Sequence, residues 1–434
     1  MSADAFPAAA NGAPPPVDWG SSAMSARRRR RYAADRRLQA YGIVAIAFAL
    51  GFLALLVGTL TFTGYRAFTQ TMATVEIDLS KAGIDRGDLM DADWRGIVRG
   101  ELRKLVADLP RSAERDYFAI FTASAHFLVR DAVIRRPALL DGPASYKIPL
   151  SDPLDQLHKG QFDRDLPEDQ RRVSDRQIGF YDQLVARGLI SAPFNTGLFF
   201  NSDSRFPELA GLAGAISGSF WALLVCFLIS FPVGIAAAIY LEEFAPKNRV
   251  TDLIEININN LAAVPSVVFG LLGLAMFLGW FGLPRSAPLV GGMVLALMTL
   301  PTIIIVTRAA LKSVPSSIRE AALGIGASKS ETIFHHVLPL AMPSVLTGTI
   351  IGLAQALGET APLLLIGMNA FITSASGGVL DASTALPTQI YIWADSPERG
   401  FVSRTSAAIL VLLAFLITMN AIAIFLRQRF ERRW

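Results

Sequence analysis

The sequence predicts an all-α polytopic membrane protein with six transmembrane helices and an inserted α+β domain outside the cytoplasm. Of the 434 residues, 52% are apolar and only 18% are charged, whereas soluble proteins carry about 25% charged residues. The apolar residues also gather in uninterrupted runs of roughly 20 residues, the length that crosses a bilayer. The composition therefore excludes a purely soluble enzyme and a disordered scaffold.

Residues 1–40 predict a disordered, basic, cytoplasmic terminus. Residues 1–26 are rich in Ala, Pro, Gly and Ser without an apolar period, and a basic block follows from Arg27 to Arg37. The apolar run at 41–64 exceeds the core of a signal peptide, which has about 7–15 residues, and therefore predicts a transmembrane anchor. A nucleic-acid-binding role for the arginines is the alternative, which their position beside an apolar span disfavours.

Residues 65–207 predict a folded α+β domain on the outer, periplasmic side of the membrane. Acidic and basic residues are nearly balanced there, and short amphipathic stretches alternate with Pro and Gly. Thr71 to Leu79 alternates like a strand, whereas Trp94–Leu109 and Arg176–Ile190 have helical periodicity. A segment of about 140 residues is long enough to bury a core of its own.

Five further apolar runs predict the remaining spans, at residues 209–241, 261–283, 287–311, 341–367 and 405–426. With the N-terminus inside, 17 Lys and Arg residues lie on the cytoplasmic side, and 3 lie in the short outer loops. This asymmetry predicts that both termini are cytoplasmic. The single cysteine, Cys226, lies within an apolar run, and only four histidines are present, so we expect no disulfide and no metal site.

A short amphipathic helix–turn–helix is predicted between the fourth and fifth spans, at residues 314–339. Ser316 or Ser317 begins the first helix, and Gly324 with Gly326 ends it. The apolar stripe of this helix consists of Ile318, Ala322 and Ile325. Ser328 and Glu331 form a capping box for a second helix, which Pro339 should stop. Such short helices are marginal alone, so we expect docking into a partner's groove. A helix lying on the lipid surface is the alternative, but it would have a predominantly basic polar face.

This segment resembles the EAA loop of ABC-transporter permease subunits. The matching positions are Glu320, Ala321, Ala322, Gly326, Leu338 and Pro339. The chain departs from the pattern at His336, where the family usually has Ile or Val. Two further stretches are similar to phosphate permeases of the PstA type. One is Gly352–Gly367, with the signature Gly358–Pro362, and the other is Pro232–Pro246. The anchor and outer domain resemble an N-terminal extension of some bacterial members.

The resemblance implies a five-helix ABC importer permease core over residues 208–430, with a coupling loop at 314–339, in the bacterial inner membrane. In that family Arg319 and Glu320 would orient the loop in the groove of an ATPase subunit, Ala321 and Ala322 would permit close approach, and Gly326 would form the turn. The implied partners are a PstC-like second permease, a PstB-like ATPase dimer and a PstS-like periplasmic phosphate-binding protein, besides the lipid bilayer. No cofactor is expected in this chain, because ATP and Mg²⁺ would bind the ATPase. Consistently, the chain has no GxxxxGK[ST] phosphate loop.

Candidate residues of the substrate path are Arg308, Gln355, Glu359 and Thr360. Ionisable groups within spans are functional candidates by default, although Arg308 could instead anchor its helix at the membrane surface. Many phosphate permeases have Arg at the position of Gln355, so the chain departs from the family pattern there. Another oxyanion, such as sulfate or molybdate, is the alternative substrate. A membrane sensor is disfavoured because no signalling domain follows the last span. A membrane enzyme is also disfavoured, since no paired carboxylates or His cluster lie in the spans.

Overall fold

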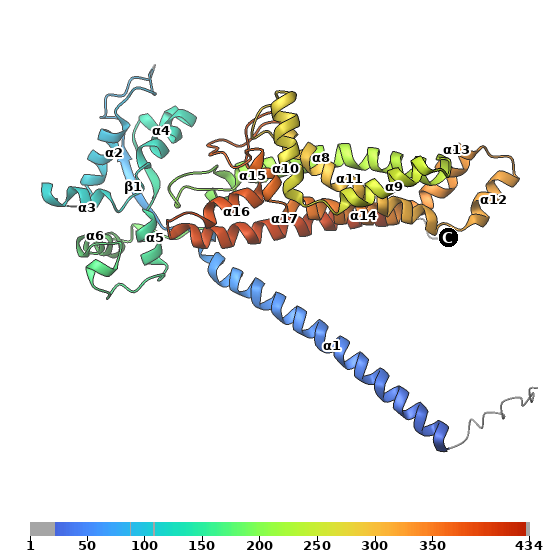
Figure 1. Cartoon of the computed structure of the whole chain (residues 1–434). Coiled ribbons are helices and arrows are strands. Elements are labelled where there is room, and N and C mark those ends of the chain that lie inside the picture. Colours follow the sequence, from blue (N-terminus) through green and yellow to red (C-terminus); the bar gives the residue numbers. More distant parts are fainter. Residues whose placement is uncertain (1–21, 87, 107–108, 431–434) are drawn as a thin grey trace, which may run out of the picture. The chain divides into compact units, whose positions relative to one another are not determined.

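The computed structural model describes residues 22–86, 88–106 and 109–430. This part of the chain is largely helical and contains one small sheet (Figure 1). The chain divides into two compact units, Met1–Thr59 and Leu60–Trp434. The disorder predicted for residues 1–21 falls outside the described residues.

The N-terminal anchor is a single helix, α1, at Ser22–Gly64. It contains the predicted span at 41–64, but it already begins five residues before Arg27 and includes the whole basic block. Residues 22–40 are therefore helical, and the prediction of disorder there was wrong. No Gly or Pro interrupts this stretch, and Ala and Arg are strong helix formers, so the helix of the apolar span continues through it.

The outer domain is built on a three-stranded antiparallel sheet in the order β2-β1-β3. Its strands are β1 Met72–Asp78, β2 Pro143–Pro149 and β3 Ile190–Ser191. In the central strand β1, alternate side chains are buried, which places Ala73, Val75 and Ile77 in the core. The predicted strand at 71–79 is therefore confirmed, and it pairs with a strand about 70 residues later, with Val75 opposite Tyr146.

Short helices surround this sheet. The α-helices are α2 Trp94–Arg103, α3 Glu114–Phe118, α4 Ala125–Arg135, α5 Asp152–His158, α6 Asp175–Ala186 and α7 Gly197–Phe200. Single 3₁₀ turns are η1 Tyr65–Phe68, η2 Arg111–Ala113, η3 Pro137–Leu140 and η4 Glu168–Gln170. Helices α2 and α6 confirm the two helical predictions, each ending a few residues earlier than expected.

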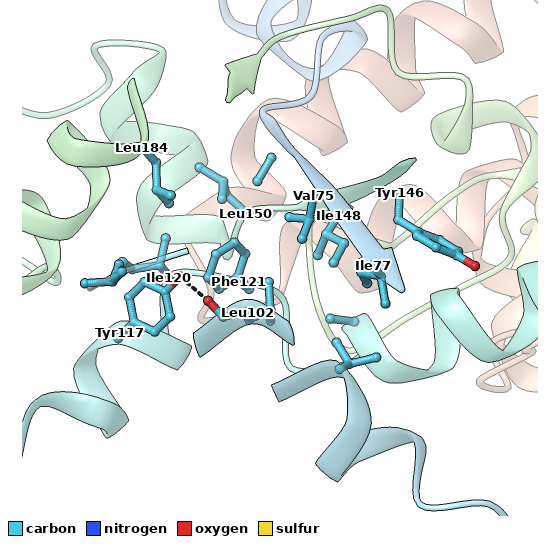
Figure 2. Close-up of a cluster of buried hydrophobic side chains, with 14 of the residues drawn as sticks. Val75, Ile77, Leu102, Tyr117, Ile120, Phe121, Tyr146, Ile148, Leu150 and Leu184 are labelled. Carbon is cyan, nitrogen blue, oxygen red and sulfur yellow. Dashed lines mark hydrogen bonds between the residues drawn. The ribbon is translucent and has the colours of Figure 1, made fainter. Parts of the chain in front are cut away.

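One continuous apolar core joins the sheet to the helices of the outer domain (Figure 2). Val75 and Ile148 from adjacent strands lie in the same cluster as Tyr117 of α3 and Leu102 of α2. The Tyr117 hydroxyl donates a hydrogen bond of 2.7 Å to the Leu102 carbonyl oxygen, which satisfies the one polar atom of that buried ring. The domain therefore has its own hydrophobic core, as its length predicts.

The membrane part consists of long helices joined by shorter ones. The α-helices are α8 Ala213–Ile239, α9 Arg249–Ala262, α10 Ser266–Gly273, α11 Pro288–Ser313, α12 Ser316–Gly324, α13 Lys329–Glu331, α14 Leu338–Gly358, α15 Ala361–Leu365, α16 Leu386–Ala394 and α17 Gly400–Phe430. Three π-helical segments are η5 Tyr240–Phe244, η6 Leu274–Trp280 and η7 Thr332–Val337. Helices α8, α11 and α17 confirm the spans predicted at 209–241, 287–311 and 405–426.

Glycines allow close packing around α8. A Cβ atom on Gly292 of α11 would lie 2.5 Å from the Val225 Cβ of α8, so only glycine permits this approach. Of the predicted pair Gly214 and Gly218, only Gly218 lies at a close contact, and its partner is a loop rather than another helix. A Cβ atom on Gly218 would lie 2.0 Å from the Thr384 carbonyl oxygen.

The span predicted at 261–283 is not one straight helix. Helices α9 and α10–η6 together pass as a membrane segment, but they are bent by 99° at the break between them. Pro265 stands in this break, where it lacks an N–H and forces the preceding residue out of helical geometry. Residues 266–280 would be only about 22 Å long as a helix, which is less than the hydrocarbon thickness.

A buried charge cluster joins the outer domain to the membrane helices. Its members are Asp152, Asp155, Lys159, Glu208 and Arg404. The Lys159 ammonium contacts an Asp155 carboxylate oxygen at 2.6 Å, and the other oxygen accepts the Thr71 N–H at 2.8 Å. Arg404, in the first turns of α17, donates to the Ala210 carbonyl oxygen at 2.6 Å. Its charge favours ionisation of Asp152 and Glu208 across the interface.

The ionisation of Asp152 makes this interface sensitive to pH. Burial, followed by the charges of Glu208 and Asp155, raises the pKa of Asp152 to about 6 from its ordinary 3.8, against the opposing effects of Arg404 and a hydrogen bond from Gln156. At pH values between 3.8 and about 6, the native protein holds more protons at Asp152 than the unfolded chain does. The contribution to stability is therefore greatest at low pH and is lost as the pH rises through 6.

We expect the unfolding temperature of the full chain to fall between pH 5 and pH 7.5, and Asp152→Asn to reduce that fall.

The matched control is Asp182→Asn, which removes a carboxylate from an exposed ion pair with Arg164 in the same domain. Exposed pairs contribute little to stability, so this variant should keep the pH dependence of the parent protein. An unchanged dependence in Asp152→Asn, measured by thermal unfolding in detergent, would contradict the assignment.

Candidate functional site

The candidate coupling segment, residues 314–339, lies at the opposite end of the membrane helices from the outer domain (Figure 1). It begins with α12, turns at Gly326 and continues through α13 and η7 into α14. The predicted capping box is confirmed: the Ser328 hydroxyl accepts the Glu331 N–H at 3.3 Å, and the Glu331 carboxylate accepts the Ser328 N–H at 2.8 Å. The predicted helix–turn–helix is thus present.

Gly326 determines the turn between the two helices. Its φ angle is +90°, in the left-handed region where residues with a side chain are strained. Its N–H donates to the Leu323 carbonyl oxygen at 3.0 Å, and the next N–H, of Ala327, donates to Ala322 at 3.1 Å, which closes the end of α12. No atom lies within 4 Å of a Cβ built on Gly326, so the requirement for glycine comes from backbone conformation alone.

Arg319 ties α12 to the membrane helices. Its guanidinium contacts a Glu243 carboxylate oxygen at 2.7 and 3.2 Å through two nitrogens. It also donates to the carbonyl oxygens of Val314 at 2.7 Å and Leu311 at 2.8 Å. Arg319 is thus placed on the inner side of the segment, whereas the resemblance assigned it to the groove of a partner.

The outward side of the segment is both charged and apolar. Glu320 and Ala321 are exposed, and the Glu320 side chain makes no hydrogen bond or ion pair among the residues that the structure describes. Leu323 is 51% exposed and Ile325 is 84% exposed. Of the predicted apolar stripe, Ala322 is buried and Ile318 is half-buried, whereas Ile325 is exposed beyond the end of the helix. Helix α12 ends at Gly324, and the turn directs the following residue outward.

The remaining residues of the motif lie on the inner side of the segment or in the next helix. Ala322 faces the membrane helices, and Leu338 and Pro339 begin α14. Ala322 is 3% exposed, and Leu338 packs on an apolar cluster that includes Leu311, Ile333 and Val337. Pro339 does not stop the second helix as predicted. Residues 332–337 wind with π-helical hydrogen bonding, and Pro339 then occupies the first turn of α14, where a missing N–H is tolerated.

Arg308 belongs to a cluster of ion pairs rather than standing as a free cation. It contacts Glu255 of α9 at 2.6 Å and Glu242 of η5 at 3.4 Å, and Lys312 also contacts Glu242 at 3.4 Å. The acidic partners Glu242, Glu243 and Glu255 were not predicted from the sequence. The pair of glutamates that ends an apolar run, followed by Phe244, Ala245 and Pro246, is the signal that could have indicated the first two.

Gln355, Glu359 and Thr360 lie where the predicted span at 341–367 breaks. Helix α14 ends at Gly358, Glu359 is extended with ψ of 121°, and α15 begins only at Ala361. Glu359 is half-buried and Gln355 is exposed. Within the described ranges, no hydrogen bond or ion pair joins either residue to Arg308. The structure therefore does not bring the four candidate path residues together.

Two family models match the chain. Residues 230–434 match "Binding-protein-dependent transport system inner membrane component", and residues 25–168 match "Domain of unknown function (DUF3333)". The second match covers α1 and much of the outer domain.

Curated relatives match mainly the C-terminal part. PstA 1 of Mycobacterium tuberculosis H37Rv, a phosphate transport system permease protein, is 31% identical over 58% of this chain and 81% of its own length. PstA of Yersinia pestis is 31% identical over 49% of this chain and 71% of its length. The probable ABC transporter permease protein YqgI of Bacillus subtilis is 32% identical, and the chain spans only 63% of its length.

Solved structures that resemble the chain include the inward-facing MetNI methionine ABC transporter. This structure is 17% identical, covers 50% of this chain and 97% of the other, and has a TM-score of 0.39. The relatives and the family model, rather than this likeness, decide the classification. The chain belongs to the binding-protein-dependent ABC-transporter permeases, as a multi-pass membrane protein of the PstA type with an N-terminal DUF3333 region.

Proposed function

We propose that the chain is the permease subunit of an ATP-driven ABC importer for inorganic phosphate in the bacterial inner membrane, with both termini cytoplasmic. A PstC-like second permease would complete the path, a PstB-like ATPase dimer would supply the energy, and a PstS-like binding protein would deliver the substrate. The chain itself would neither bind nor hydrolyse ATP.

One observation carries this proposal: one side of the coupling segment contacts the membrane helices, and the other side is exposed. Arg319 and Ala322 fix α12 to the membrane helices, while Glu320, Leu323 and Ile325 are left exposed. An exposed acid beside exposed apolar side chains suits a groove on another protein better than a layer of lipid headgroups.

The fixed side supports a mechanical role. Arg319 contacts Glu243 of η5 and the end of α11, and Leu338 leads directly into α14. A push on α12 from an ATPase subunit would therefore act on α8, α11 and α14 together. Rigid transmission of this kind can shift a bistable bundle between two orientations.

Phosphate is the substrate that the relatives favour, because several carry the name phosphate transport system permease protein. Another oxyanion such as sulfate or molybdate is the alternative, since YqgI is named only as a probable ABC transporter permease. A signalling function has no support among these relatives.

Replacement of Gly326 by valine should abolish ATP-dependent uptake. A β-branched residue in the left-handed region costs about 1–3 kcal/mol, and the turn would rearrange to relieve it. We expect at least a tenfold loss of phosphate uptake in reconstituted vesicles, with normal amounts of protein in the membrane.

The matched control is Gly324→Ala, two residues away. Gly324 does not have a positive φ angle, and no atom lies within 4 Å of its Cβ position. This variant should transport normally. Normal uptake by Gly326→Val would contradict the coupling role of the turn.

Competition should distinguish the substrates. The complex, reconstituted with its ATPase and binding protein, should take up labelled phosphate, and at a saturating concentration of label a tenfold excess of unlabelled phosphate should reduce this uptake about tenfold. The same excess of sulfate or molybdate should leave it unchanged. Stronger competition by sulfate than by phosphate would favour the alternative substrate.

A further inference from the structure

An arginine-lined cleft lies between the outer domain and the segment that leads into α8. Its volume is about 810 Å³. Five arginines line it: Arg95 and Arg99 from α2, Arg111 and Arg115 from η2 and α3, and Arg205 from the segment before α8. The cleft is therefore built by two parts of the chain, and it is remote in sequence from the coupling segment and from the candidate path.

The folding of α2 accounts for the first two arginines. Trp94, Val98 and Leu102 recur four residues apart and bury one face of the helix in the core. Arg95 and Arg99, also four residues apart, lie together on a neighbouring, exposed face. Arg111 and Arg115 have the same spacing in the next helical segment. Like charges one turn apart destabilise a helix by about 0.2–0.5 kcal/mol per pair, so this spacing is not explained by the stability of the fold.

The carboxylates around the cleft already have partners. Glu114 pairs with Arg103 at 2.6 Å, and Glu398 pairs with Arg172 at 2.9 Å. Asp152 accepts a hydrogen bond from Gln156 at 2.6 Å, and it belongs with Glu208 to the charge cluster around Arg404. Among the described residues, none of the five arginines of the cleft forms an ion pair. The five arginines are thus left unpaired, and they outnumber the four carboxylates that line the same cleft, so its lining carries excess positive charge.

Aromatic rings position two of these guanidinium groups. Arg99 stacks over Phe118 at 5.3 Å from the ring centroid, and Arg205 stacks over Phe371 at 5.9 Å. Stacking holds the flat face of a guanidinium and leaves its N–H donors along the edge available. The positive field is also felt at His126, whose pKa is lowered first by burial and then by Arg95, Arg130 and Arg99.

We propose that this cleft binds a phosphoryl-type tetrahedral oxyanion on the outer side of the membrane. Guanidinium groups match such anions with paired, charge-assisted N–H donors. The volume falls within the range of about 300–1,000 Å³ that is typical of small-ligand sites. The choice of inorganic phosphate as the probe rests on the proposed function, whereas anion binding by the cleft does not depend on which substrate is transported.

Equilibrium dialysis of the purified full chain with radiolabelled inorganic phosphate tests the proposal. In maltoside detergent and phosphate-free buffer, we expect saturable binding that weakens as salt increases. The double variant Arg99→Gln with Arg115→Gln should weaken binding at least tenfold. Both side chains are exposed, so its unfolding temperature should match that of the parent protein.

The matched control removes two arginines from exposed ion pairs elsewhere in the domain, Arg86→Gln with Arg164→Gln. It makes the same change in charge and should retain binding. Equal binding by both double variants, or no saturable binding by the parent protein, would overturn the proposal, and the second result would leave an acidic protein surface as the occupant to be tested.

Binding in nanodiscs distinguishes two sources of the oxyanion, a soluble phosphate ion and the headgroup of a lipid. Phosphate binding that persists in anionic-lipid nanodiscs supports a soluble anion, and binding that is lost there supports a lipid headgroup; both outcomes keep the oxyanion assignment. Gly326→Val separates this proposal from the function above, because it should bind phosphate normally while failing to transport it.

Discussion

Arg319 joins three parts of the chain that the sequence separates: the start of α12, the end of α11 and Glu243 after α8. Hydrogen bonds between charged groups are roughly twice as strong as neutral ones, and this side chain makes several of them in one place. Without this contact, only the apolar packing of Ala322 and Ile318 would hold α12 against the bundle. The orientation of the coupling segment, and with it the proposed transmission of force, therefore depends on Arg319 and Glu243.

A related arrangement holds the other end of the molecule. Arg404 near the start of α17 lies among carboxylates of the outer domain, and both ends of the bundle thus use a guanidinium to unite segments far apart in the chain. Charges removed from water require partners, so these contacts also determine which segments can pack together. The outer domain is consequently built onto the permease rather than tethered beside it, and the arginine-lined cleft lies at that junction.

Much of this architecture could be predicted from local patterns, because period-2 and period-3.6 spacing and apolar length are local properties. The strand at β1, the helices α2 and α6, the capping box at Ser328 and the turn at Gly326 are of this kind. The elements that were not predicted also have local causes. The amphipathic α9 precedes the predicted span at 261–283, the break at Glu359 lies inside an apolar run, and a π-helical segment accommodates Pro339. The glutamates that pair with Arg308 and Arg319, and the Ala210 carbonyl bound by Arg404, lie 53 or more residues away, so only tertiary structure reveals them.

Charge reversal at the Arg319–Glu243 contact tests the central claim most directly. ATP hydrolysis and phosphate uptake would be measured together in the reconstituted complex for Arg319→Glu, Glu243→Arg and the double variant. We expect each single variant to hydrolyse ATP with little uptake, and the double variant to regain part of the uptake, since a glutamate at 319 cannot donate to the carbonyls of Val314 and Leu311. Lys247→Glu, which makes the same change of charge as Arg319→Glu at an exposed position, serves as the control for charge. Full coupling in both single variants would contradict the account.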